Sequence, residues 1–390
     1  MTDHYDVVVV GGGIHGVGVA QAAASYGYSV LLLEKTALAA GSSSRSSKLI
    51  HGGLRYLEGY DFGLVRESLV ERAILLQIAP ELVRLQPFHI PVYPETSRRP
   101  PAIRVGLTLY ALLGGLDRAS RFKKLPRSHW DRLDGLAIDR LQAVYQYHDA
   151  QTNDADLTRA VMQSAIDLGA HLSCPAEFLG ATIGEQGVDI LFRDGACEKN
   201  CTAAVLVNAG GPWVNTIAAR ISPQPAGIDA DLVQGSHLVL EGGLTAGCYY
   251  MEAPRDRRAV FLLPWGGQCM LGTTENVYHG DPAQVAALDE EEDYLLAVMA
   301  HYFPERPQQV VARFAGLRVL PAAAGNSTCS RSRETCLPTD NPACPRTVAI
   351  YGGKLTGYRA TAGKVMKILR RTLPARKQRA NTAELPLQPV

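Results

Sequence analysis

The stretch YDVVVVGGGIHG, residues 5–16, decides the fold. Its apolar, β-branched first half predicts a buried strand, which three consecutive glycines interrupt. The alanine-rich residues 14–26 predict a helix, and residues 29–33 predict a second strand. A strand, a tight glycine turn, a helix and a second strand in this order predict a Rossmann-type βαβ unit of an α/β protein.

The glycines of this turn have the spacing Gly11-x-Gly13-x-x-Gly16. The first permits the tight turn, the second lets the backbone approach a pyrophosphate, and the third allows the helix to pack closely on the strand. Glu34 follows the second strand, where a carboxylate can accept hydrogen bonds from a ribose diol. This pattern predicts a dinucleotide site, and by itself it does not choose between NAD and FAD.

Two further features favour FAD. A Gly/Ser-rich loop at residues 41–47 follows the βαβ unit directly, and the turn Gly352-Gly353-Lys354 suggests that the chain returns to an elongated ligand. Strand–glycine signals at 5–16, 203–211 and 347–353 predict one nucleotide-binding domain assembled from three segments. We therefore expect two domains and a tail: an FAD-binding domain over 1–75, 150–220 and 310–375, a substrate domain over 76–149 and 221–309, and a flexible basic tail over 376–390.

Composition narrows the class of protein. The 390 residues are 46% hydrophobic and 20% charged, which is typical of a globular protein, and the net charge of +1 argues against nucleic acid as a partner. The N-terminus has no basic region followed by a long apolar run, so we expect a cytoplasmic protein. Eight cysteines are scattered without the paired spacing of a zinc site, so we expect reduced thiols and no metal.

Residues 42–58 read SSSRSSKLIHGGLRYLE, which closely resembles the signature of FAD-dependent glycerol-3-phosphate dehydrogenases, a group of D-amino-acid-oxidase-like flavoproteins. The likeness continues at 208–213, 235–237, 263–265, 272–275, 316–318 and 352–359. It implies a p-hydroxybenzoate-hydroxylase/D-amino-acid-oxidase-like architecture, with a Rossmann-like FAD-binding domain and a β-sheet-rich substrate domain. Typical members carry an additional C-terminal helical domain, and we expect this chain to lack it.

The resemblance also implies which residues hold FAD. The glycine turn at 11–16 and Glu34 would hold the diphosphate and the adenosine ribose. The serine loop would line the pyrophosphate and flavin, and the turn at 352–354 would place backbone amides near the flavin pyrimidine. The residues implied are Gly11, Gly13, Ile14, His15, Gly16, Glu34, Lys35, Ser42, Ser43, Ser46, Ser47, Lys48, His51, Gly210, Trp213, Gly353, Lys354, Leu355 and Thr356. Among them His15 departs from the family, because a neutral polar residue is usual there. Arg45, Asp156 and Gly357 are further departures.

The substrate residues implied by the resemblance are Arg55, Tyr56, His237, Arg318, Arg333 and Lys354. A phosphate dianion in a partly closed site needs two or more cations, and arginine supplies bidentate donors. Arg331 is a second candidate beside Arg333. His237 and Arg318 are the expected catalytic pair: His237 as the base that takes the hydroxyl proton, with a neutral orienting role as the alternative, and Arg318 as stabiliser of the alkoxide.

These residues predict oxidation of sn-glycerol 3-phosphate to dihydroxyacetone phosphate by hydride transfer to flavin N5. The alternative is an FAD-dependent oxidase or dehydrogenase of another anionic substrate, a 2-hydroxy acid or an amino acid or amine. A flavin-binding tRNA-modifying or regulatory protein is a third possibility, which the near-neutral charge disfavours. A quinone acceptor, peripheral contact with the cytoplasmic face of the inner membrane and a homodimer are expected on the resemblance alone.

Overall fold

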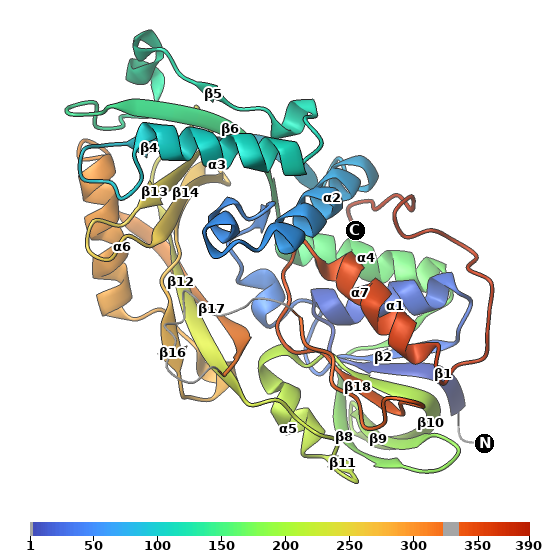
Figure 1. Ribbon diagram of the computed structural model, residues 1–390. Helices are drawn as coiled ribbons and strands as arrows, with labels where there is room; N and C mark the ends of the chain where they lie inside the picture. The colour runs from blue at the N-terminus through green and yellow to red at the C-terminus, as the bar shows by residue number, and fades with distance from the viewer. Residues whose placement is uncertain (1–2, 323–334) are drawn as a thin grey trace.

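A computed structural model describes residues 3–322 and 335–390, and these residues form two β-sheets with helices packed on them (Figure 1). The first sheet has the strand order β11-β8-β9-β10-β1-β2-β7, with β18 also paired to β10. Its strands are β1 (Asp3–Val10), β2 (Val30–Leu33), β7 (His171–Ser173), β8 (Ala176–Ile183), β9 (Val188–Asp194), β10 (Cys197–Asn208), β11 (Ile221–Ser222) and β18 (Thr347–Ala349).

Three segments far apart in the sequence form the centre of this sheet. Strand β1 runs parallel to both β10 and β2, with Val8 opposite Leu206 and Leu31. Strand β10 in turn runs parallel to β18, with Leu206 opposite Thr347. The strand–glycine signals at 5–16, 203–211 and 347–353 therefore lie side by side, as the sequence predicts.

Helices cover one face of the first sheet. They are α1 (Ile14–Ser25), α4 (Asp154–Asp167) and α7 (Tyr358–Leu369), which pack against one another. Because side chains alternate along a strand, Val7 and Val9 enter the core beneath these helices, while Val8 and Val10 pack on the opposite face with β8–β10. Burial on both faces is the reason that β1 reads as a continuous apolar run.

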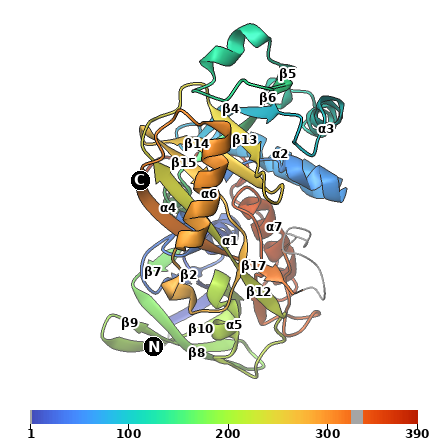
Figure 2. The ribbon, with the colours of Figure 1, turned by 90° about the vertical axis from the view of Figure 1, so that its left-hand side faces the viewer.

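The second sheet has the order β16-β12-β15-β14-β13-β4-β6-β3, with β17 paired to β12 and β5 to β6. Helix α6 (Asp289–Tyr302) covers one face, as Figure 2 shows, and α2 (Phe62–Ile78) and α3 (Pro100–Leu113) cover the other. The strands are β3 (Leu49–Ile50), β4 (Val83–Val92), β5 (Lys123–Lys124), β6 (Ala143–Thr152), β12 (Ala230–Leu240), β13 (Cys248–Glu252), β14 (Ala259–Trp265), β15 (Gln268–Gly272), β16 (Asn276–Tyr278) and β17 (Val310–Pro321).

The structure differs from the sequence-based expectation at two elements. The pattern over 64–86 predicts one helix, but α2 ends at Ile78 and β4 begins at Val83, because residues 83–92 pair along their whole length with β6. Residues 310–321 were expected in the FAD-binding domain, whereas β17 pairs with β12 and so belongs to the second sheet. In both cases long-range strand pairing, which local sequence does not encode, decides the assignment.

The C-terminal residues are ordered against the first domain, so the expectation of a flexible tail over 376–390 is wrong. Leu387 is buried in the core beneath the helices, and its amide donates to the Ile78 carbonyl. The Arg379 amide donates to the Ser25 carbonyl at the end of α1. One buried leucine and a few backbone hydrogen bonds hold this otherwise polar segment in place. Within residues 3–322 and 335–390, no helix combines the length and apolarity needed to cross a membrane.

Candidate cofactor and substrate site

The glycine turn after β1 brings three backbones into contact. Gly11 has φ +114, and a Cβ there would lie 2.5 Å from the carbonyl oxygen of Ala209, which follows β10. A Cβ at Gly16 in α1 would lie 1.9 Å from the Gly11 carbonyl oxygen. Because neither position has room for a side chain, the turn, α1 and the end of β10 can pack this closely only with glycine at both positions.

The N-terminus of α1 is prepared for an anion. Gly13 occupies the N-cap position without a capping side chain, and the first turn of α1 has no acidic residue. The Ile14 amide donates to Ser43 Oγ at 2.9 Å. The first amides of a helix lack partners within the helix and face the positive end of its dipole, so this end favours a phosphate group.

Glu34 lies beside this turn at the end of β2. Its carboxylate accepts hydrogen bonds from the Gly12 amide at 2.7 Å and from the Thr36 amide at 2.8 Å, which fixes the carboxylate next to the phosphate turn. The neighbouring Lys35 is exposed, and its ammonium pairs with Glu177 at 3.1 Å. That contact gives no support to the expected role of Lys35 at the cofactor.

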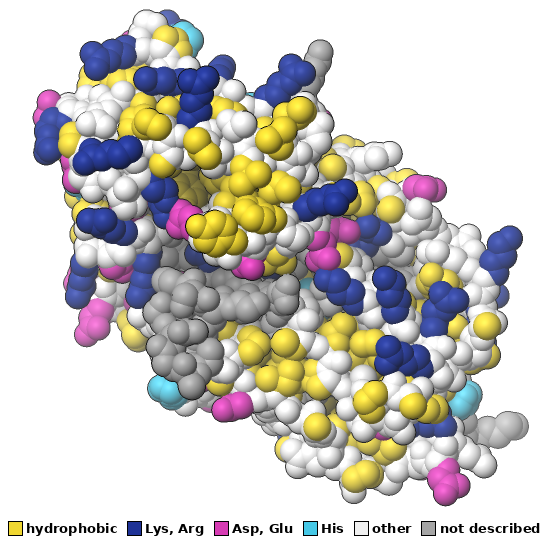
Figure 3. All heavy atoms as spheres, viewed as in Figure 1, with side chains coloured by type: hydrophobic (Ala, Val, Ile, Leu, Met, Phe, Trp, Pro, Cys, Tyr) yellow, Lys and Arg dark blue, Asp and Glu magenta, His cyan; other side chains and the backbone are white. Residues whose placement is uncertain are grey.

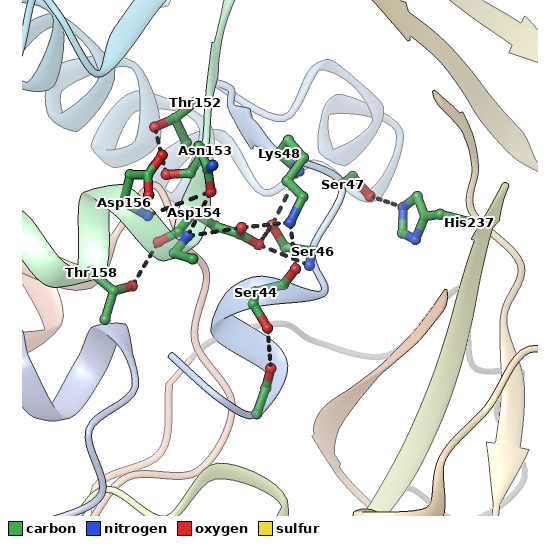
Figure 4. Close-up of polar contacts among 12 residues, drawn as sticks. Ser44, Ser46, Ser47, Lys48, Thr152, Asn153, Asp154, Asp156, Thr158 and His237 are labelled. Carbon is green, nitrogen blue, oxygen red and sulfur yellow. Dashed lines mark hydrogen bonds and ion pairs between the residues drawn. The ribbon is translucent and has the colours of Figure 1, made fainter. Parts of the chain in front are cut away.

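The serine loop, residues 42–48, is anchored to the start of α4 (Figure 4). Asp154, the first residue of α4, is fully buried and accepts from the Ser46 amide and hydroxyl and from Lys48 Nζ at 2.6 Å. Lys48 also donates to the Ser44 carbonyl and is itself only 5% exposed. The charge of Lys48 is therefore used inside the protein to hold the loop.

The same loop reaches the second sheet. Ser42 Oγ donates to the Leu317 carbonyl at 2.6 Å, and Ser47 Oγ lies 2.9 Å from His237 Nε2, as Figure 4 shows. A Cβ at Gly316 would lie 2.4 Å from the Arg45 carbonyl oxygen, so β17 passes directly against the loop. The serine loop thus joins the phosphate turn, α4 and strands β12 and β17.

His237 is held rigidly in β12. Its ring stacks on Phe314, which lies opposite it on β17, with 5.0 Å between centroids and 13° between planes. Burial, together with the charges of Arg318 and Lys48, lowers the pKa of His237 to about 3. The imidazole is therefore neutral at physiological pH.

Two of the predicted substrate cations lie on the ring of Tyr56 in η2 (Leu54–Gly59). Lys354 Nζ is 3.7 Å from the ring centroid and Arg55 Cζ is 5.2 Å from it, distances at which a cation is attracted to an aromatic face. The ring of His51 stacks on the same tyrosine. Residues from the serine-loop region and from the returning turn therefore meet at Tyr56.

Arg318 approaches this group from β17. Its guanidinium lies 3.4 Å from Glu275 Oε1 and 3.3 Å from Thr273 Oγ1. Burial opposes the charge of Arg55, but Tyr56, Glu275 and Tyr250 together raise its pKa. Arg55 and Arg318, 263 residues apart in the sequence, therefore interact with the same carboxylate.

The returning turn closes the site from the C-terminal side. Gly353 has φ +99, and a Cβ there would lie 2.3 Å from His15 Nε2. Burial lowers the pKa of His15 to about 4, so this imidazole is also neutral near pH 7. The His51 amide donates to Thr356 Oγ1 at 3.0 Å, and Leu355 packs on the core of the first domain. The turn is thus attached to both the phosphate-turn helix and the loop after β3.

The remaining predicted cofactor residues lie at the edge of the serine loop. A Cβ at Gly41 would be 3.2 Å from the Trp213 ring, so Trp213 packs against the start of the loop. The Gly210 amide donates to Asn208 Oδ1 at 3.1 Å at the end of β10. Arg331 and Arg333 lie outside the described residues.

Three residues that shape the site were not assigned roles from the sequence. They are Asp154, which anchors the serine loop, Glu275, which pairs with Arg318, and Phe314, on which His237 stacks. Asp154 follows Asn153, whose side chain caps α4, and an aspartate at a helix start is ordinarily explained by the helix dipole alone. No local pattern distinguishes Phe314 from any other core aromatic residue.

Comparison with known proteins identifies the family. The family model described as FAD dependent oxidoreductase matches residues 6–361. The chain belongs to this family. The predicted oxidoreductase class, α/β fold and FAD cofactor are thereby confirmed. Among its relatives, a glycerol-3-phosphate dehydrogenase of Pseudomonas aeruginosa is 38% identical over 93% of this chain and 71% of its own length. A D-erythritol 1-phosphate dehydrogenase of Brucella abortus is 34% identical over 95% of this chain and 74% of its own length.

A solved structure shows the same fold. The glycerol-3-phosphate dehydrogenase of Bacillus halodurans, determined in complex with FAD, is 25% identical in sequence and superimposes with a TM-score of 0.75. The match covers 98% of this chain and 68% of that protein.

The residues of this family member fit FAD. The N-terminus of α1, where Gly13 supplies no capping side chain, offers amide donors to a diphosphate, and Glu34 is fixed beside it for a ribose. Gly353 brings the backbone of the returning turn against His15, at the position where the resemblance expects the flavin. If FAD binds with its diphosphate at the N-terminus of α1, the predicted residues 353–356 would hold its flavin end, beside the cations on Tyr56.

Replacing Gly16 with alanine should abolish stable FAD binding, because a Cβ 1.9 Å from the Gly11 carbonyl forces the turn open. We expect affinity for FAD to fall by more than about tenfold, or ~1.4 kcal/mol. Flavin absorbance retained after gel filtration measures this. Gly363→Ala in α7 is the matched control, because no atom lies within 4 Å of its added Cβ. Equal flavin content in the two variants would contradict the assignment.

The buried, neutral His237 should make stability depend on pH. Below its ordinary pKa of about 6.5 the unfolded histidine binds a proton, whereas the folded one stays neutral down to about pH 3. Stability is therefore fully present above pH 6.5 and is lost as pH falls toward 3. Between about pH 7 and pH 5 the wild type should lose about 2 kcal/mol more unfolding free energy than His237→Gln. Urea unfolding at each pH measures the difference, and parallel losses would show that the imidazole titrates normally.

Proposed function

We propose that this enzyme oxidises the secondary alcohol of sn-glycerol 3-phosphate to dihydroxyacetone phosphate and passes the electrons to a quinone. The observation that carries the proposal is the meeting of Arg55, Arg318 and Lys354 around Tyr56 and Glu275, close to His237. Relatives named for phosphorylated polyols support it, as does the FAD dependence of the family.

The charge of this group suits a phosphate. A phosphate ester carries about −1.5 to −2 near pH 7, and three cations, Arg55, Arg318 and Lys354, suit such a dianion. A carboxylate substrate would be satisfied by one arginine. The number of cations therefore favours a phosphorylated polyol over a 2-hydroxy acid or an amino acid.

We propose that His237 takes the hydroxyl proton of the substrate. Bound FAD would accept the hydride that leaves the carbinol carbon. In our proposal neutral His237 takes the hydroxyl proton on Nε2 in the same event, exchanging its hydrogen bond to Ser47 Oγ for one to the substrate. Stacking on Phe314 keeps the ring plane fixed during this exchange.

A pKa of about 3 would make His237 a weak base, and a bound phosphorylated substrate would raise this pKa. Besides burial, the charges of Arg318 and Lys48 lower this pKa. A phosphate dianion bound to Arg318 would offset the larger of these two charge effects and raise the pKa, while the effect of burial remains. His237 would thus be a stronger base with a phosphorylated substrate bound than without it.

A second candidate substrate is D-erythritol 1-phosphate. It is favoured by the Brucella abortus relative, which is 34% identical over 95% of this chain. Both substrates offer a phosphate to the cations and a hydroxyl to His237, and they differ in the length of the polyol. Comparing kcat/KM for the two compounds decides between them.

We further propose that α3 and the adjoining η2 segment contact the surface of an anionic membrane, where a lipid-soluble quinone is available. Helix α3 packs against η2 and α2, and apolar side chains gather over this region in Figure 3. Two large side chains of this region are widely exposed to solvent: Tyr60 is 78% exposed and Val105 is 68% exposed. Grouped exposed apolar side chains are typical of interaction surfaces. The other exposed residues of this surface include Leu112, Leu116, Arg66, Arg99, Arg104, Glu58, Asp61 and Asp117, so charges of both signs surround the apolar side chains.

Arg55→Ala should weaken the use of phosphorylated substrate by removing one arm of the phosphate clamp. A charge-assisted hydrogen bond contributes about 1.5–3 kcal/mol, so kcat/KM for sn-glycerol 3-phosphate should fall about 10–100-fold, mostly through KM. Steady-state dye reduction measures this. Arg66→Ala, an exposed arginine on α2, is the control. An unchanged KM in Arg55→Ala would show that Arg55 does not bind the substrate phosphate.

Val105→Asp should reduce binding of the holoenzyme to vesicles that contain anionic phospholipid, because it puts a charge into the apolar surface of α3. We expect a loss of about tenfold in partitioning, which cosedimentation measures. Ile166→Asp on α4 is the control, since Ile166 is 38% exposed on the other domain. Equal partitioning of wild type and both variants would argue against this surface.

A further inference from the structure

A buried carboxylate outside the substrate group, Glu291, connects the strands that carry the catalytic residues. It lies in the first turn of α6, is 2% exposed and accepts the Leu288 amide at the helix N-terminus. That contact alone would make it an ordinary helix cap. Its other partners come from two further segments of the second sheet.

One of these segments is β12. Glu291 Oε2 accepts hydrogen bonds from Ser236 Oγ and from Gln234 Nε2 at 2.6 Å. Side chains alternate along a strand, so Gln234 and Ser236 face α6 while His237 faces the opposite side. Glu291 therefore fixes one face of β12, and His237 on the opposite face contacts Ser47.

The other segment follows β15. Glu291 Oε1 accepts from Thr274 Oγ1 at 2.7 Å and from Asn276 Nδ2 at 2.8 Å. These two residues flank Glu275, the carboxylate that pairs with Arg318. Thr274 Oγ1 also accepts the Ser236 amide at 2.8 Å, which closes the network between the two segments. One carboxylate thus fixes the neighbours of His237 on one side and of Glu275 on the other.

The network needs the charged form of Glu291. Five donors point at its two oxygens: four side chains and one backbone amide. Burial opposes the charge, but hydrogen bonds from Ser236, Thr274, the Leu288 amide and Asn276 lower the pKa of Glu291. An amide in its place would turn one oxygen into a donor, so the contacts to that atom would have to break or reverse their direction.

We propose that Glu291 is a positioning residue for the reaction: its carboxylate holds His237 on β12 in register with Glu275 and Arg318. The inference rests on the proposed function for its kinetic consequence. Its structural consequence, a fixed register between β12 and residues 273–276, is independent of the substrate.

The test compares Glu291→Gln with Glu292→Gln in the FAD-bound enzyme. Glu292, the next residue of α6, pairs with Arg313 on the molecular surface, so its variant removes the same charge without touching the network. Hydrogen exchange followed by mass spectrometry should show faster exchange in 232–240 and 270–278 for Glu291→Gln only. Unchanged exchange in these peptides would overturn the proposal whatever the substrate is.

Kinetics then test whether the network acts through His237. The limiting rate of anaerobic flavin reduction by sn-glycerol 3-phosphate should fall about tenfold or more in Glu291→Gln and less than about twofold in Glu292→Gln. In a double-mutant cycle with His237→Asn, the second substitution should add much less than its single effect. If the losses in limiting rate from the two substitutions multiply fully, Glu291 acts only as a structural cap of α6. No reduction of wild-type flavin by this substrate would instead contradict the proposed function and leave the exchange result to decide the positioning role.

If Glu291→Gln fails to fold, Asn276→Ala answers the same question. Asn276 is exposed, and its loss removes a single hydrogen bond from Glu291 Oε1. Exchange in 270–278 and the limiting rate should then change in the same direction by a smaller factor. A stable Asn276→Ala enzyme with wild-type values for both would count against the proposal.

Discussion

The ion pair between Lys48 and Asp154 is the contact on which the rest of the site depends. It is buried on both sides, with 2.6 Å between the charged atoms, and it fixes the serine loop to the start of α4. Removing one partner would leave a buried charge uncompensated, at a cost of about 3–5 kcal/mol. The same loop places Ser43 at the phosphate turn and Ser47 beside His237. This pair therefore sets the distance between the cofactor end and the substrate end of the site.

Much of the first domain could be predicted from local sequence. The order of strand, glycine turn, helix and strand is specific, and the close contacts at Gly11 and Gly16 explain why this turn needs glycine at both positions. The three-segment assembly was predictable because each segment ends in glycine. The boundary between α2 and β4 and the place of β17 were not, because both depend on pairing with β6 and β12, far away in the chain. The ordered tail depends on the buried Leu387, on backbone hydrogen bonds to Ser25 and Ile78 and on the ion pair of Arg376 with Asp6, none of which a periodic pattern indicates.

For the site, sequence indicated residue types better than residue partners. Arg55, Lys354, Arg318 and His237 were named from their motifs. The structure places Arg55 and Lys354 on Tyr56 and Arg318 beside Glu275, and the charge of Arg318 acts on His237. Lys48 was expected to line the cofactor loop, whereas its charge is directed to Asp154. The partners Glu275, Phe314 and Glu291 were missed because each contacts a residue far away in the sequence, and a carboxylate or aromatic side chain carries no local sign of such a partner. Motifs therefore predicted the chemistry, and tertiary packing determined how it is held.

The central claim is that three converging cations select a phosphorylated polyol for oxidation by FAD. The most direct measurement is anaerobic reduction of the enzyme-bound flavin by single compounds, followed by its absorbance. The account predicts rapid bleaching by sn-glycerol 3-phosphate or D-erythritol 1-phosphate, and little by glycerol, a 2-hydroxy acid or an amino acid at the same concentration. Rapid bleaching by an unphosphorylated compound, with none by either phosphate ester, would contradict it.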